Sequence, residues 1–158
     1  MIMSSPQETS LSDRELKAFT DVISAYFETA LREKPQIDKP YLKGDQQLIL
    51  DFTGIIGFSG DRKGCIYLTS PKITLERILK EMGETDFSVD ILTDMIGEVT
   101  NTISGNVRNV FGSNFQISVP ISLGGRPSYI KLPDYISTLV IPINLGGQIS
   151  YFIIGVEK

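Results

Sequence analysis

Histidine is absent from the 158-residue sequence, and cysteine occurs once, at Cys65. Without histidine, Ser–His–Asp and Cys–His catalysis, His-ligated metal sites and phosphohistidine chemistry are all excluded. A single cysteine cannot form an intramolecular disulfide or a paired zinc or redox site, which agrees with a reducing compartment. An enzyme with this composition must use carboxylates, amides, hydroxyls or the groups of a partner.

Other missing features narrow the class of protein. No G-x-x-x-x-G-K-[ST] loop is present to bind a nucleotide, and no apolar run approaches the roughly 20 residues that span a bilayer. The N-terminal residues MIMSSPQETS lack the basic and apolar parts of a signal peptide. A net charge of −4 argues against the basic face of a nucleic-acid-binding protein. We therefore expect a cytoplasmic protein that binds neither nucleic acid nor membrane.

The features that are present predict one α+β domain. Residues 1–10 are polar and are expected to form a flexible N-terminus, followed by a single domain over residues 11–158. Apolar periodicity predicts two long helices and one shorter helix, at about residues 13–32, 90–111 and 72–82. Apolar runs between turn residues predict strands at 47–52, 53–59, 65–69, 115–123, 138–144 and 148–156. The predicted fold is an antiparallel β-sheet of about six strands with the three helices packed against it.

The helix predicted at residues 90–111 carries the most distinctive polar pattern. One face is apolar, and the opposite face carries Asp94, Glu98, Asn101 and Gly105. An acid and an amide three residues apart are surface neighbours on a helix, with Cβ atoms about 5–6 Å from each other. From spacing alone, Glu98 and Asn101 are either a chemical site or two polar residues on the wet side of an amphipathic helix.

Two further sets of residues on this helix have alternative interpretations. Asp90, Asp94 and Glu98 form an acidic row that either attracts a basic partner or a cation, or is simply a solvated face. The small residues at 97, 104 and 105 either allow a second protein to approach closely or allow the helix to pack on the sheet. These small residues are Gly97, Ser104 and Gly105.

Gly97-Glu98-Val99-Thr100-Asn101 forms an E-x-x-N pattern on this predicted helix. With this pattern the sequence resembles the CheX group of the CheC/CheX/FliY family of chemotaxis phosphatases, which has a similar E-x-x-N helix, and the resemblance depends mainly on it. Three other segments support it and extend it from about residue 16 to residue 156: PYLKGD at 40–45, GIIGFSGDRKG at 54–64 and FQISVP at 115–120. Neither Glu15 nor Glu28 of the first helix is followed by asparagine at the matching separation, which favours the CheX type with one motif over the CheC type with two.

The resemblance implies a phosphatase that removes the phosphoryl group from the aspartyl phosphate of a CheY-like response regulator. Glu98 would pair with the regulator's active-site lysine, and Asn101 would orient the attacking water. An amide suits that role because it donates and accepts hydrogen bonds but does not accept a proton near neutral pH. The chain would need no cofactor of its own, since Mg²⁺ would come with the regulator. Asp94, Gly97, Ser104 and Gly105 would contact this partner.

The resemblance also implies a homodimer joined through sheet strands, with the irregular segment 124–132 as a candidate contact. Two other functions remain as alternatives. The same fold could be a non-catalytic module that docks on a receiver domain or another signalling partner. A hydrolase that binds a metal through Asp90, Asp94 and Glu98 is a third hypothesis.

Overall fold

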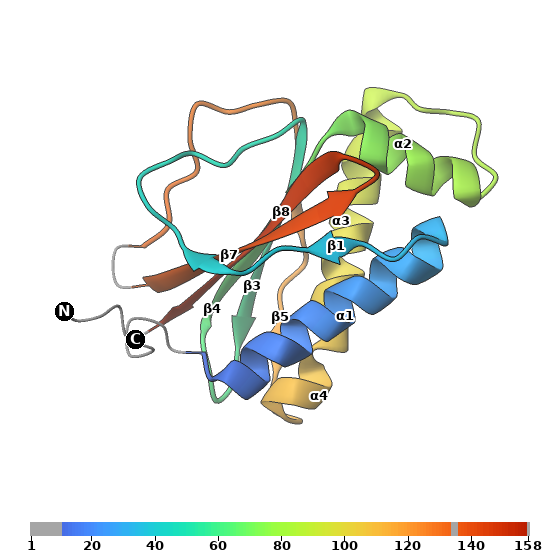
Figure 1. Cartoon of the computed structure of the whole chain (residues 1–158). Helices are drawn as coiled ribbons and strands as arrows, with labels where there is room; N and C mark the ends of the chain where they lie inside the picture. Colours follow the sequence, from blue (N-terminus) through green and yellow to red (C-terminus); the bar gives the residue numbers. More distant parts are fainter. Residues whose placement is uncertain (1–10, 134–135, 158) are drawn as a thin grey trace.

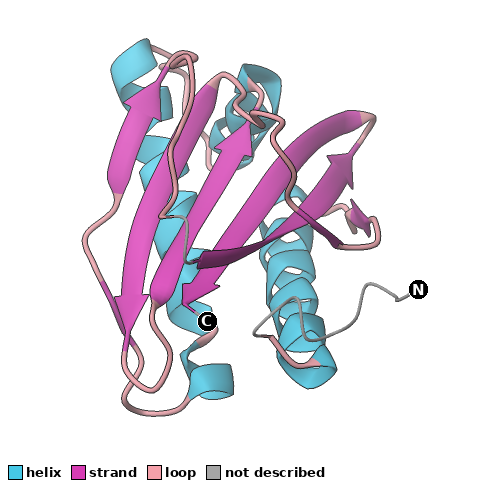
Figure 2. Cartoon of the chain, turned by 90° about the vertical axis from the view of Figure 1, so that its left-hand side faces the viewer, coloured by secondary structure: helices cyan, strands magenta, loops and turns pink. Residues whose placement is uncertain are grey.

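The computed structural model describes residues 11–133 and 136–157, so the N-terminus predicted to be flexible lies outside the described residues. Within the described residues, one layer is an antiparallel sheet and the second layer is formed by helices on one face of that sheet (Figure 1 and Figure 2). In chain order the elements are α1 (Asp13–Leu31), β1 (Gln36–Ile37), β2 (Tyr41–Leu42), β3 (Phe52–Ser59), β4 (Gly64–Ser70), α2 (Lys72–Glu81), α3 (Val89–Asn106), α4 (Arg108–Phe111), β5 (Gln116–Ile117), β6 (Ile121–Gly124), β7 (Ile136–Leu145) and β8 (Gln148–Glu157).

The predicted α+β fold class is confirmed. The eight strands are arranged in the order β1-β7-β8-β4-β3-β5, with β2 also paired to β7 and β6 also paired to β3. The predicted number of strands, about six, was too small because β1 and β2 contain only two residues each. Runs that short carry no alternation that a sequence pattern could reveal.

Helix α1 shows how the sequence sets the helical layer. Its first turn is closed by a capping box, in which Ser12 and Glu15 each accept a hydrogen bond of 3.0 Å from the other's backbone N–H. Apolar residues four positions apart then form one buried face: Phe19, Ile23, Phe27 and Leu31. This face packs into the core that the helices share with the sheet.

The two faces of the sheet are buried in different ways. On β4, Ile66 and Leu68 point into the main core under the helices, whereas Tyr67 between them points to the outer face. There Tyr67 forms a second apolar cluster with strand residues and with residues of two long loops. The other members are Val140 and Ile153, with Leu48, Ile55, Ile130, Leu132 and Tyr151 packed against them. The long loops therefore cover part of the face that the helices leave open.

The strand predicted at residues 47–52 is wrong for all but its last residue. The segment crosses the outer face instead of joining the sheet edge. Its backbone is bound by side chains: the Leu50 N–H donates to Thr69 Oγ1 at 2.7 Å, and the Tyr67 hydroxyl donates to the Leu48 carbonyl at 3.5 Å. Side-chain partners of this kind satisfy the backbone without a ladder. Segment 128–132 is irregular, as predicted.

Two predicted elements are each divided in the structure. The strand predicted at 115–123 is split into β5 and β6 around Pro120, which has no N–H to donate to a ladder. At the split, Ser118 pairs with Gly57 through its backbone N–H (2.8 Å) and its hydroxyl oxygen (2.9 Å). The helix predicted at 90–111 ends at Asn106, and Val107 separates it from the short α4.

Candidate functional site

The predicted site residues lie on α3, which is anchored on the sheet. The helix begins at the N-cap Ser88, whose hydroxyl oxygen accepts a hydrogen bond of 3.4 Å from the Ile91 N–H. Its buried face contacts β3, β4 and β6 and contains Leu92, Met95, Ile96, Val99 and Ile103. Because this face is fully buried, the helix cannot rotate without exposing core residues, and its outer residues are held in a fixed direction.

The outer side of α3 carries a row of four residues that we call the ridge: Asp94, Glu98, Asn101 and Gly105. Asp94, Glu98 and Gly105 are exposed, and Asn101 is partly buried. The predicted orientation of these four residues is therefore confirmed.

Glu98 and Asn101 form no side-chain hydrogen bond or ion pair within the part of the chain that the structure describes. The ion pairs formed there use other acidic residues, namely Glu15, Asp21, Glu33, Asp51 and Glu81. No hydrogen bond between described residues involves the Asn101 amide or the Glu98 carboxylate. Both groups can therefore bind a second molecule without first breaking a hydrogen bond or an ion pair within the described part of this chain.

Gly97 and Ser104, predicted as partner contacts, face the protein interior instead. A Cβ added at Gly97 would collide with Ser122 Oγ of β6 and would lie 3.8 Å from Pro120 Cγ. Ser104 is fully buried. The structure therefore corrects the prediction for these two residues: they allow α3 to pack closely on the sheet, and only Gly105 of the three small residues is open to a partner.

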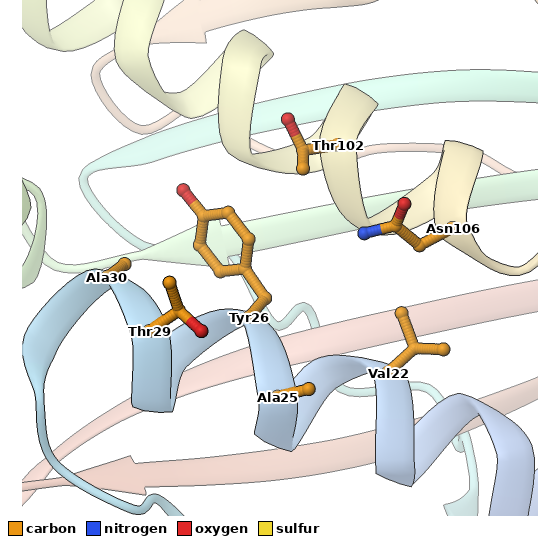
Figure 3. A pocket seen from close by; sticks show the side chains of 7 residues that line it. All are labelled: Val22, Ala25, Tyr26, Thr29, Ala30, Thr102 and Asn106. Atoms are coloured by element: carbon orange, nitrogen blue, oxygen red, sulfur yellow. The ribbon is translucent and has the colours of Figure 1, made fainter.

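The ridge has two flanks that the sequence pattern did not indicate. On one side is Tyr26 of α1, which lines a groove between α1 and α3 (Figure 3). On the other side is the segment between β5 and β6, where Val119 is 84% exposed. An apolar residue this exposed beside a polar ridge is a candidate partner contact. The proline after Val119 was the signal that the chain leaves the strand there.

The acidic row does not form a metal site in the described part of the chain. No three of the His, Cys, Asp and Glu side chains described gather closely enough to hold an ion. Asp90, Asp94 and Glu98 are spread along the helix instead, so the metal-hydrolase hypothesis has no donor set to support it. No described helix is both long enough and apolar enough to cross a membrane.

The fold and the ridge together define a class of protein: an α+β domain that presents an acid and an amide on an exposed, sheet-anchored helix. The sequence model of the family "Chemotaxis phosphatase CheX" matches residues 52–144, a span that contains α3 and the strands from β3 to β6. The chain belongs to this family. No curated protein sequence matches this chain.

Solved structures of this class resemble the chain over nearly its whole length. A CheC-like superfamily protein from Shewanella sp. PV-4 is 25% identical, with a TM-score of 0.82 and coverage of 94% of this chain and 100% of that one. The chemotaxis protein CheX from Vibrio vulnificus is 23% identical, with a TM-score of 0.79 and coverage of 90% and 99%. The CheX–CheY–BeF3–Mg²⁺ complex from Borrelia burgdorferi is similar in fold, with 21% identity, a TM-score of 0.72 and coverage of 91% and 98%.

Proposed function

We propose that this protein hydrolyses the aspartyl phosphate of a CheY-like response regulator and so ends its signal. The main observation behind the proposal is the pair Glu98 and Asn101, which lie one turn apart on the outer side of α3 and form no side-chain hydrogen bond or ion pair with the described residues. Membership of a phosphatase family supports the reaction. The similar Borrelia protein, which is bound to CheY, BeF3 and Mg²⁺, supports this kind of partner.

Asn101 has the chemistry needed to orient water. Hydrolysis of an acyl phosphate requires a water molecule in line with the bond to the leaving carboxylate. An amide can accept a hydrogen bond from that water while donating another to a neighbouring oxygen. Asn101 is partly buried on an anchored helix, which restricts its side chain. Placement of this kind can lower a barrier by several kcal/mol, because the orientation of the reactants is fixed in advance.

Glu98 provides the charge that aligns the two proteins. Its carboxylate is exposed and forms no ion pair with another described residue, so a lysine of the regulator can reach it. A charge-assisted hydrogen bond formed at a desolvated interface contributes about 1.5–3 kcal/mol. The exposed ridge residues Asp94 and Gly105 would extend the contact above and below this pair.

The metal in this reaction would belong to the regulator. The described part of this chain offers no group of three ligating side chains, which does not fit a resident Mg²⁺ site. In the similar Borrelia complex, Mg²⁺ is present together with CheY and BeF3, a group that stands in for the phosphoryl group. This chain would supply the acid and the amide, and the regulator would supply the phosphoaspartate, the lysine and the ion.

The protein would also form a homodimer through its sheet. Both edges of the sheet expose large apolar side chains: Tyr41 and Leu42 of β2 at one edge, and Ile121 of β6 at the other. Such residues are often covered by a second chain. Light scattering across a concentration series should give the mass of two chains. A monomer at every concentration would reject the dimer and leave the phosphatase proposal unaffected.

The proposed phosphatase activity is tested by measuring how fast a phosphorylated receiver loses its phosphoryl group. Catalytic amounts of the protein should shorten the lifetime of a phosphorylated CheY-like receiver. Glu98→Gln should mainly weaken binding, and Asn101→Ala should mainly slow hydrolysis. The exposed residues Glu28 and Asn109 allow matched controls, Glu28→Gln and Asn109→Ala, which should behave as wild type. Stoichiometric binding without turnover would instead identify a non-catalytic docking module.

A further inference from the structure

A β-bulge separates β5 from β6 at the edge of the sheet beside α3. Phe58 of β3 pairs with Ile117. Ile55 of the same strand pairs with Ile121. Three steps along β3 therefore face four steps along the neighbouring chain, so the segment 118–120 contains one extra residue. Bulges of this kind change the direction of a side chain, and they occur often beside active sites.

The bulge changes which residues face α3. Before it, Ile117 lies on the helix side, with its Cδ1 4.0 Å from the position of a Cβ at Gly105. After it, Pro120 lies on the helix side, with its Cγ 3.8 Å from the position of a Cβ at Gly97. Regular alternation would put residues 117 and 120 on opposite sides. The alternation therefore switches at Val119, and this side chain, 84% exposed, projects from the edge of the sheet.

The backbone around Val119 is fixed by its neighbours. The Ser118 N–H donates to the Gly57 carbonyl at 2.8 Å, and the Ser118 hydroxyl oxygen accepts from the Gly57 N–H at 2.9 Å. The same hydroxyl donates to the Val119 carbonyl at 3.1 Å. On the other side, the ring of Pro120 fixes its own φ angle. The exposed valine is therefore presented at a defined place on the surface.

That place is beside Asn101 of the ridge. The segment passes Gly105 first and Gly97 last, so it runs along α3 in the opposite direction (Figure 1). The two glycines are about 12 Å apart along the helix axis. The extended chain between the two contacts spans about 10 Å, which matches this length. Asn101 lies midway between the glycines and Val119 lies between the contacts, so the two residues are at about the same level.

We propose that Val119 is the apolar contact through which the phosphorylated receiver docks beside Asn101. The inference rests on the proposed function for the identity of this partner. A standard interface buries about 800 Å² on each partner, a patch roughly 16 Å in radius. A receiver centred on Glu98 and Asn101 therefore also covers Val119. The exposed carboxylates of Asp94 and Glu98 favour a basic surface, and Val119 requires an apolar side chain of the receiver at the border of that surface.

A second copy of this chain is the other molecule that could cover Val119. Pairing of two sheet edges needs free backbone N–H and C=O groups. In the segment 118–120, the Ser118 N–H is already bonded to β3 and Pro120 has no N–H. The segment can therefore add at most one N–H to a ladder. It offers a side chain rather than a strand edge, which favours the receiver over pairing between two sheets.

The test measures affinity for a CheY-like receiver loaded with BeF3 and Mg²⁺. Val119→Ser should weaken binding about five- to thirtyfold, whereas Val119→Ile should stay within about threefold of the wild type because the apolar contact is kept. Met82→Ser is the matched control, since Met82 is also an exposed apolar residue (62%) but lies at the end of α2. It should bind as the wild type does. Equal affinity of the wild type and Val119→Ser, or an equal loss in Val119→Ser and Met82→Ser, would overturn the proposal.

Two further measurements separate the possible outcomes. In turnover, Val119→Ser should raise KM in proportion to the lost affinity and change kcat by less than about twofold. A wild-type protein that binds the loaded receiver without turnover would reject the phosphatase activity, and the affinities would still decide the role of Val119. Light scattering should give one mass for the wild type and Val119→Ser. A mass halved by the substitution would show that a second copy covers Val119 and would overturn the proposal, as would a wild-type protein that binds no receiver.

Discussion

A substitution at Gly54 tests how α3 is anchored. Gly54 lies on β3 beneath α3, where the helix packs tightly on the sheet. A Cβ added there would lie 2.9 Å from the Ile96 carbonyl oxygen and 3.0 Å from Thr100 Cβ, and would collide with Thr100 Oγ1. The carbonyl oxygen belongs to the helix backbone, and Thr100 Oγ1 already donates to it at 2.7 Å. Gly54→Ala therefore cannot be accommodated by turning one side chain, and α3 must move.

The expected cost follows from two opposing effects. Overpacking of a close contact destabilises by about 1–3 kcal/mol. Replacing glycine by alanine reduces the entropy of the unfolded chain, which returns about 0.4–1 kcal/mol. The net loss should be about 1–2 kcal/mol in the free energy of unfolding, or roughly 2–8 °C in Tm for a chain of this size. Because α3 carries the ridge, we also expect a loss of turnover of about tenfold or more.

Gly57 supplies the matched control. It lies on the same strand but on the opposite face, and the nearest atom to an added Cβ is Ser118 Oγ at 3.8 Å. Gly57→Ala should therefore change the stability by less than about 0.5 kcal/mol. Urea unfolding and the turnover assay on both variants make the comparison. If Gly54→Ala were as stable and as active as Gly57→Ala, the close contact between α3 and the sheet would not control the site.

Three further predictions concern stability. The buried hydroxyl of Ser104 has no hydrogen-bond partner among the described residues. Ser104→Ala should therefore raise the free energy of unfolding in urea by roughly 0.5–1 kcal/mol. A loss of stability would contradict this and show that the hydroxyl is hydrogen-bonded. Ser12→Ala should cost about 0.5–2 kcal/mol through the α1 capping box, and an unchanged Tm would contradict that role. Tyr67 has its pKa raised to about 12, first by burial and then by the nearby Cys65. The unfolded phenol ionises near pH 10, so the stabilising contribution of Tyr67 is complete below pH 10 and is lost as the pH rises to about 12. Between pH 10 and pH 12 the free energy of unfolding should therefore fall by up to about 2–3 kcal/mol less in Tyr67→Phe than in the wild type. An equal fall in both proteins would contradict this role of Tyr67.

The helical layer could be predicted from the sequence because its signals are local. The apolar spacing of α1 and its Ser12 cap lie within the helix itself, and the same holds for α3. The segment 47–52 has the alternation of a strand, but its backbone is bound by Tyr67 and Thr69, which follow later in the chain. No local pattern contains those partners. The same reason explains why the pairing of β2 with β7 was not predicted.

The site could be predicted only in part. The helical period placed Glu98 and Asn101 outward, and the structure agrees. The helical periodicity could not predict whether Gly97 is buried or exposed, because this residue lies at the border of the apolar face. Its burial depends on Ser122 of β6, which is distant in the sequence. Tyr26 was not identified because it is distant in sequence, and in α1 its spacing is that of an ordinary half-buried aromatic residue.

The most direct test of the central claim is the hydrolysis of a phosphorylated CheY-like receiver by Asn101→Ala. Single-turnover dephosphorylation at saturating protein should be measured together with binding of the receiver loaded with BeF3 and Mg²⁺. If Asn101 orients the attacking water, the rate should fall by about 100-fold while the affinity stays within about threefold of the wild-type value. An Asn101→Ala protein that dephosphorylates the receiver at the wild-type rate would contradict the account.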